Sequence, residues 1–520
     1  MLKHWTLSGR RVQGTGYSLD MPDPHWYPVP CHLSPSRCLL LSAYCLLLFS
    51  SACMVGPKYR RATAPVPPAY KETPPDNSQE MKSWKPAQPN DGASRGKWWE
   101  IYNDPQLNAL EEQVSISNQN VLAAEAQFRA AKDVVRIARS SLFPTVTAGP
   151  SITNARTPST LTNVAASVRT TYDVPVDLSY QADVWGSIRH SVGASAAAAQ
   201  VSAAQLENAR LSFQAVLAQD YFLLHGTDGD RDLLERTVKS YEDYLHLTKD
   251  RFNAGVASGG DVAEAETQLD TARAQLIDLG VARAQFEHAI AILIGKPPAA
   301  LSIPSATIKS PPPPIPVGVP STLLERRPDI AAAERQMAAA NEQIGIAKAT
   351  YYPALNLSAA GGLESADFLK WFTWPGRFWS VGPQLAETLF DAGKRRAQVD
   401  LAQAAYEATV ANYRQTVLTG FQQVEDNLAA LRVLADEARA EDQAVQAAER
   451  SLAISTAQYK AGTASYLQVI TSQAIALQDE RSAVNILTRR MVASVLLIEA
   501  LGGGWDASTL PNAQDLVHGK

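Results

Sequence analysis

Histidines, carboxylates and glycine-rich turns are the residues of this chain that could do chemistry, and their spacing does not predict a catalytic site. Glu111 and Glu112 occupy consecutive positions of a predicted helix, so their carboxylates would not converge. Gly259-Gly260 and Gly502-Gly503-Gly504 lack the Lys-Ser/Thr pair that completes a phosphate-binding loop. The histidines beyond the amino-terminal segment stand apart, without a second ligand at metal spacing: His190, His225, His246, His288 and His518. We therefore expect no enzyme activity, no metal site and no cofactor.

A cysteine predicts a chemical modification instead. An apolar run over residues 38–49, preceded by Arg37 and followed by Ser50-Ser51-Ala52, has the flank, core and small residues of a cleavable export signal. The run is too short to cross a membrane as a helix. Small residues that end at a cysteine resemble a bacterial lipobox, although Ser50 stands where leucine is usual. This implies cleavage before Cys53 and diacylation of its sulfur, with palmitate as the lipid; the alternative is a plain signal peptide with a bystander cysteine.

The same segment indicates a compartment. Met54, rather than an aspartate, follows Cys53, and this implies delivery to the outer membrane. The cysteines all lie at or before residue 53, so the mature chain would have no thiol except the acylated one: Cys31, Cys38, Cys45 and Cys53. A net charge of -5 and a pI near 6.0 give no basic surface for nucleic acid.

Polar residues follow two glycine turns and have the spacing of helix caps. Gly255-Val256 precedes Asp261 and Glu264, whereas Gly462-Thr463 precedes Gln468 and Thr471. In a capping box, side chains three residues apart each bind the other's backbone N–H. Three pairs have this spacing: Ser258 with Asp261, Asp261 with Glu264, and Ser465 with Gln468. Capping alone would be a sufficient reason for these residue types.

The two turns belong to an internal duplication. Phe252-Asn253-Ala254-Gly255 and Tyr459-Lys460-Ala461-Gly462 lie about 207 residues apart, and this register persists through most of each half. The repeated unit is too long for a solenoid, so we expect two similar halves that form one object. The expected divisions are an upstream extension with the signal peptide (1–52), an extended segment (53–104), the first repeat (105–296), a Pro-rich linker (297–320), the second repeat (321–505) and a tail (506–520).

Each half contains two stretches in which apolar and polar residues alternate. Residues 142–153 and 172–184 alternate in the first half, and residues 353–359 and 380–389 in the second. Such runs suit strands that cross a bilayer with one face toward lipid and the other toward a lumen. The strands of a soluble sandwich also alternate but are usually shorter. The carboxylates expected on the lumen face are Asp173, Asp177 and Asp183. Four strands cannot close a barrel, so the chain must oligomerise.

Very long helices follow these strands. Residues 187–252 and 394–459 contain no proline, and at about 1.5 Å per residue each could form a rod approaching 100 Å. Each rod is expected to turn at a glycine, Gly255 or Gly462, and to return as a second helix. The residues with heptad spacing are Leu234, Val238, Tyr241, Leu245 and Phe252 in the first rod and Val417, Phe421, Val424, Leu428 and Leu431 in the second.

Several motifs together resemble the TolC-type outer membrane efflux proteins, in their NodT-like lipoprotein branch. The similarity extends over residues 53–505. Its most specific motif is Arg326-Arg327-Pro328-Asp329-Ile330. The others are Cys53-Met54-Val55-Gly56-Pro57-Lys58-Tyr59, Trp98-Trp99 with Asp104-Pro105, Phe390-Asp391-Gly393 and Tyr459-Lys460-Ala461-Gly462.

The resemblance implies an α+β fold in which a homotrimer forms a 12-stranded outer membrane barrel, continued by a periplasmic barrel of coiled-coil helices. It implies a lipid-anchored exit duct that receives small molecules, such as drugs, from an inner-membrane efflux pump through a periplasmic adaptor. The adaptor would face the turns at Gly255-Val256 and Gly462-Thr463. In relatives, polar residues just beyond such turns constrict the aperture, which makes Asp261, Glu264, Gln468 and Thr471 gate candidates. The second half lacks a carboxylate there. The alternative function is a coiled-coil surface lipoprotein that acts as a scaffold without conducting.

Overall fold

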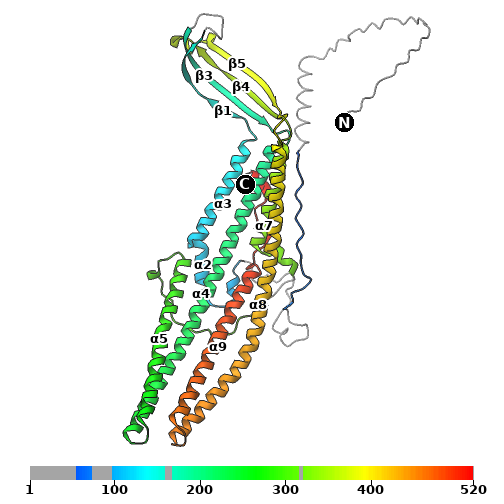
Figure 1. Ribbon diagram of the computed structural model, residues 1–520. Helices are drawn as coiled ribbons and strands as arrows, with labels where there is room; N and C mark the ends of the chain where they lie inside the picture. Colours follow the sequence, from blue (N-terminus) through cyan, green and yellow to red (C-terminus); the bar gives the residue numbers. More distant parts are fainter. Residues whose placement is uncertain (1–53, 73–95, 159–166, 316–319, 519–520) are drawn as a thin grey trace, which may run out of the picture. The chain divides into compact units, whose positions relative to one another are not determined.

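A computed structural model describes residues 54–72, 96–158, 167–315 and 320–518 (Figure 1). The predicted export signal and Cys53 lie outside these residues. The first half consists of η2 (Trp98–Tyr102), α2 (Pro105–Ser117), α3 (Gln119–Ser140), β1 (Thr145–Ala148), β2 (Ser151–Thr157), β3 (Ser167–Ala182), α4 (Ser187–Asn253) and α5 (Gly259–Leu293). The second consists of α6 (Leu323–Arg326), α7 (Pro328–Ala349), β4 (Ala354–Ser365), β5 (Arg377–Ala386), α8 (Lys394–Lys460) and α9 (Tyr466–Ala500). The short elements are η3 (Pro298–Ala300), η4 (Pro320–Thr322), η5 (Phe368–Lys370), η6 (Trp374–Gly376), η7 (Ala507–Thr509) and α10 (Ala513–His518).

The duplication predicted from the sequence is visible residue by residue. Helices α4 and α8 each contain 67 residues, and α5 and α9 each contain 35. The glycines before α4 and α8, Gly186 and Gly393, have φ of 82° and 88°. Gly255 and Gly462 at the turns have φ of 74° and 77°. Because glycine alone adopts this left-handed backbone without steric cost, these positions set where each helix starts and stops.

Side-by-side packing of helices from both halves forms the core. Helix α4 contacts α3, α5, α7 and α9, and α8 contacts α7 and α9 (Figure 1). The seam residues Leu234, Val417 and Val424 are fully buried, as their heptad spacing predicts. Phe252 is an exception, because 49% of its surface is exposed at the end of α4. Frequent alanines let the helices approach closely, and both Ala199 and Ala204 are completely buried.

The strands form one antiparallel sheet in the order β1-β3-β4-β5, with β2 also paired to β3. The alternation predicts two faces, and the register confirms them. Leu178 lies opposite Ala359, which in turn lies opposite Val381, so these apolar residues share a face. Ser179 and Ser358 lie opposite each other on the polar face. The apolar face is not covered within the described chain: Val146, Val176, Trp379, Val381 and Leu385 are all exposed.

The first predicted strand, over residues 142–153, is interrupted in the structure. It becomes β1 and β2, separated by Gly149-Pro150. Proline has no N–H to donate to the ladder, and this explains the break. Among the described residues, no helix is both long and apolar enough to cross a bilayer.

Candidate functional site

The sheet joins the long helices through carboxylates that bind the helix starts. Asp183 lies just beyond β3, and its oxygens accept hydrogen bonds from the backbone N–H of Ile188 and Arg189, each at 2.9 Å. The Arg189 side chain also pairs with it. Asp391 serves the second half in the same way and accepts from Arg395 N at 3.2 Å. Anionic caps suit the positive end of a helix.

Asp183 therefore does not stand on the sheet, contrary to its prediction as a lumen carboxylate. Asp173 and Asp177 do stand on the polar face of β3. Asp173 lies directly opposite Glu364 of β4. Glu364 was not among the residues expected on the lumen face, because only the register of β3 and β4 brings these two acidic residues together.

The residues just after Cys53 are held between α4 and α7. His190 of α4 lies within 3.1 Å of the Val55 carbonyl oxygen through Nε2 and within 2.5 Å of Glu342 Oε2 through Nδ1. Each ring nitrogen contacts an oxygen, so the His190 ring links the amino-terminal segment to Glu342 of α7. A Cβ on Gly56 or Gly345 would meet the His190 ring at 3.0 Å or less. These two glycines therefore make the space in which His190 holds the amino-terminal segment.

The predicted turns lie at the far ends of the long helices. In the first, Gly255 N donates to Phe252 O at 2.9 Å and Val256 N to Arg251 O at 2.8 Å. In the second, Gly462 N donates to Tyr459 O at 3.0 Å and Thr463 N to Gln458 O at 2.9 Å. This is the Schellman arrangement, in which a left-handed glycine lets the last carbonyls of a helix find donors. Val256, Gly462 and Thr463 are exposed.

The four gate candidates differ in what they do locally. Asp261 completes a capping box with Ser258: each side chain accepts from the other's backbone N–H, at 2.9 and 3.1 Å. Ser465 makes no such cap in the second half, although Ser465 with Gln468 has the same spacing. Glu264, Gln468 and Thr471 are exposed, and the Thr471 hydroxyl donates to Leu467 O of its own helix. The capping interpretation therefore accounts for Asp261 and not for Gln468.

A contact that sequence reasoning missed joins the two hairpins near their tips. Arg251 Nη1 of α4 donates to Tyr459 O of α8 at 2.6 Å, and its guanidinium lies 4.4 Å from the centroid of the Tyr459 ring. Tyr459 also packs against Tyr466, with ring centroids 5.4 Å apart. Burial raises the pKa of Tyr466, so this ring stays neutral.

The repeat itself held the signal for this contact. Tyr459 occupies the position of Phe252 in the other half, yet it is only 4% exposed, whereas Phe252 is half exposed. The two halves differ at this position, because Arg251, the neighbour of Phe252, covers the ring of Tyr459. In the sequence, Arg251 precedes Phe252 in the first repeat, whereas Gln458 precedes Tyr459 in the second. This difference between the repeats is the signal that the two aromatic residues do not pack alike.

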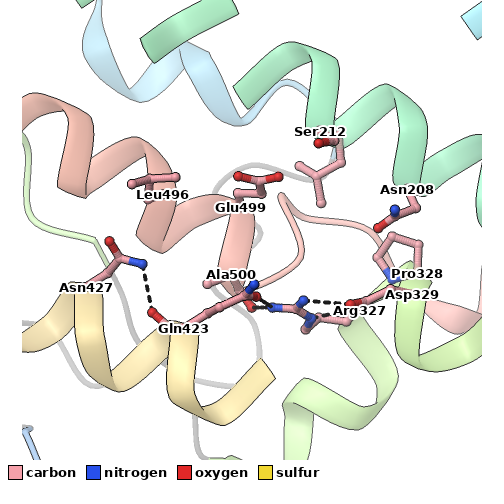
Figure 2. Close-up of a pocket in the computed structure, with 11 residues that line it drawn as sticks. Asn208, Ser212, Arg327, Pro328, Asp329, Gln423, Asn427, Leu496, Glu499 and Ala500 are labelled. Carbon is pink, nitrogen blue, oxygen red and sulfur yellow. Dashed lines mark hydrogen bonds and ion pairs between the residues drawn. The ribbon is translucent and has the colours of Figure 1, made fainter. Parts of the chain in front are cut away.

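The Arg-Arg-Pro-Asp motif has a structural task in the cavity drawn in Figure 2, which measures about 260 Å³. Arg327 donates to Ala500 O at 2.9 Å and to Gln423 Oε1 at 2.8 Å, and it pairs with Asp329. It thereby ties the start of α7 to α8 and to the end of α9. Burial raises the pKa of Glu499 on the same cavity, against the opposing effect of its hydrogen bond to Ser212.

Within residues 54–72, 96–158, 167–315 and 320–518, no three His, Cys, Asp or Glu side chains are gathered as metal ligands would be. Glu112 pairs with Lys97 at the surface while Glu111 is buried, so the two carboxylates diverge.

Known proteins resemble this chain in sequence over both of its repeats. A family model described as "Outer membrane efflux protein" matches residues 110–296 and 319–503. The "Outer membrane protein OprJ" of Pseudomonas aeruginosa is 30% identical over 473 residues, which are 90% of this chain and 96% of that protein. The "Probable efflux pump outer membrane protein TtgC" of Pseudomonas putida is 29% identical over 475 residues, 90% of this chain and 96% of that protein.

Solved structures agree in fold. The outer-membrane channel OprN aligns with a TM-score of 0.80 at 26% identity, covering 87% of this chain and all of that one. The Campylobacter jejuni CmeC outer membrane channel aligns with a TM-score of 0.80 at 23% identity, over 90% of this chain and 98% of that one.

Proposed function

Because the chain belongs to the outer membrane efflux protein family, it is an outer membrane exit duct of an efflux system, and we propose that it works as a homotrimer. Its partners are a periplasmic adaptor protein and an inner-membrane pump, and Cys53 carries the lipid anchor. The duct lies in the outer membrane and extends into the periplasm. A non-conducting scaffold is not favoured, because a scaffold has no use for a sheet with one polar face.

The observation that carries the proposal is the two-faced sheet. Its apolar face carries exposed side chains on β1, β3, β4 and β5, among them Val146, Val176, Leu357 and Val381. Its edges, β1 with β2 on one side and β5 on the other, have no partner within the described chain. Lipid does not tolerate an open sheet edge. If β1 and β2 are counted as the two pieces of one interrupted strand, each chain supplies four strands. Three copies that pair β5 of one with β1 and β2 of the next would then close a 12-stranded barrel, whose lumen carries Asp173 and Asp177.

A tube open at both ends would breach the membrane barrier, so its periplasmic end needs a gate at the hairpin turns. Arg251 holds the α4 end against the α8 end within one chain. A charge-assisted hydrogen bond contributes about 1.5–3 kcal/mol and a cation–π contact about 0.5–2 kcal/mol. Asp261 and Glu264, with Gln468 and Thr471 in the other half, follow these turns and would ring the aperture of a trimer. The exposed turns at Gly255-Val256 and Gly462-Thr463 would meet the adaptor.

Two measurements test the duct. Purified protein in planar bilayers should conduct with cation preference, because three acidic residues, Asp173, Asp177 and Glu364, stand on the polar face of the described strands with one basic residue, Arg169. Deletion of the gene should sensitise the host to antibiotics, and the full chain should restore tolerance. A protein that inserts in the bilayer without conducting, and whose loss leaves tolerance unchanged, would support the scaffold instead.

The Arg251 contact gives a separate test of the gate. Arg251→Ala should raise the open probability and make cells sensitive to bulky antibiotics, because α4 is released from α8. Arg231→Ala is the matched control, since Arg231 lies on α4 and, within the described part of the chain, pairs only with Glu235, an exposed residue of the same helix. If both variants leave the current unchanged, the contact does not hold the gate, whereas conduction itself still supports the duct.

A further inference from the structure

The loop between β4 and β5 presents a dense group of exposed apolar side chains. Phe368 is 60% exposed, Leu369 88%, Phe372 72% and Trp374 75%. The loop is nonetheless organised: Asp367 Oδ1 accepts from Leu369 N at 3.0 Å, and a Cβ on Gly376 would lie 2.8 Å from Glu364 O. Side chains of this kind, held in place and left uncovered, indicate an interaction surface.

Ring contacts place this loop on one face of the sheet. Tyr172 shares the apolar face with Val174 and Leu363, by the register of β3 and β4. The ring centroids of Phe368 and Trp371 lie 5.5 and 5.3 Å from that of Tyr172. The aromatic loop therefore extends the apolar face beyond the ends of the strands and does not fold over the polar face.

A basic residue stands within this surface. Arg377 lies opposite Leu363, so it belongs to the apolar face, and its guanidinium lies 4.7 Å from the centroid of the Trp374 ring. Stacking uses the flat face of a guanidinium and leaves its N–H edge free to bind an anion. Among the described residues, the contact that the structure gives Arg377 beyond its strand is this ring, and no carboxylate pairs with it.

We propose that residues 366–377, the lipid collar, bind an anionic lipid at the outer surface of the membrane. Arg377 takes the headgroup phosphate, and Phe372 and Trp374 take the adjoining part of the acyl chain. The inference rests on the proposed function, because it needs the sheet to lie in a bilayer. Two features favour lipid over a soluble partner: the collar continues the exposed apolar face that contains Trp379 and Val381, and aromatic residues prefer the membrane interface.

Depth-dependent quenching tests where the collar lies. The full protein is reconstituted in phosphatidylcholine vesicles whose acyl chains carry bromine either near the headgroup or deep in the chain. Trp379 lies two residues further along β5 than Arg377, about 7 Å along the strand and, because barrel strands are tilted, about 5 Å deeper in the bilayer. Trp374→Phe should reduce quenching by shallow bromine, with Trp371 keeping the remainder, and Trp379→Phe should reduce quenching by deeper bromine. If only Trp379→Phe lowers the quenching, the sheet lies in the membrane but the lipid collar does not. If neither variant changes the quenching, neither the collar nor the sheet lies in the bilayer, and both proposals are overturned.

Headgroup selectivity tests the role of Arg377. Wild-type protein in vesicles of phosphatidylcholine with phosphatidylglycerol should have a higher thermal midpoint than in phosphatidylcholine alone, and Arg377→Gln should lose this difference. Arg169→Gln is the matched control, since Arg169 lies on the polar face of β3 and should keep it. If both variants lose the difference in thermal midpoint equally, the effect is one of general charge. If Arg377→Gln keeps the difference, Arg377 does not bind the phosphate. Either result overturns the assignment.

Discussion

Glu111 of α2 predicts an unusual pH dependence of stability. The residue is fully buried, and neither carboxyl oxygen has a hydrogen-bond partner among the described residues. Burial raises the pKa of Glu111 well above its usual range. The folded chain therefore keeps a proton that the unfolded chain releases above pH of about 4.5, so the folded state binds more protons and loses stability as pH rises. This loss amounts to about 1.4 kcal/mol for each pH unit until the folded pKa is passed.

Two substitutions separate the effects of charge and burial. Glu111→Gln removes the titration and keeps unsatisfied polar atoms, so it should flatten the pH dependence. Glu111→Met removes the titration and the unsatisfied polar atoms and keeps a side chain of similar length. Because a buried unsatisfied group costs about 1–3 kcal/mol, the Met variant should be more stable than wild type by about 2 kcal/mol or more at pH 8. Denaturant midpoints, followed by the circular dichroism of the helices at pH 5 and pH 8, measure this. A Met variant less stable than wild type at pH 8, or a Gln variant with an undiminished pH slope, would refute the reasoning.

Three further predictions concern the membrane, the gate and the anchor. Leu178→Arg should impair assembly by about 2–4 kcal/mol, whereas Ser179→Arg on the other face should be tolerated; heat-stable trimers on gels report the difference. The double variant Asp261→Asn, Glu264→Gln preserves the helix cap, so a changed single-channel current or cation preference would come from a gating charge, and unchanged values leave capping as sufficient. Cys53→Ser should abolish labelling by a radioactive fatty acid, and label that persists would reject the anchor.

Local patterns of the sequence already determined the helices, strands and turns. The glycines at 255 and 462 mark turns because only glycine adopts their backbone cheaply. The rods expected over residues 187–252 and 394–459 end within one residue of α4 and α8. The period-two alternation predicted both faces of the sheet because successive side chains of a strand point to opposite sides. The capping interpretation of Asp261 also needed only its neighbours, since its partner lies three residues away.

Contacts between distant segments were decided by the tertiary structure alone. Arg251 and Tyr459 are 208 positions apart, and no local pattern shows that the end of α4 comes within reach of the end of α8. Tyr172 meets the β4–β5 loop only because of the register of β3 on β4. Asp183 alternates like a strand residue, yet it caps α4 because Gly186 starts the helix there. Pair contacts depend on how elements pack, and packing depends on the whole chain, whereas periodicity and backbone preference are properties of a few neighbouring residues.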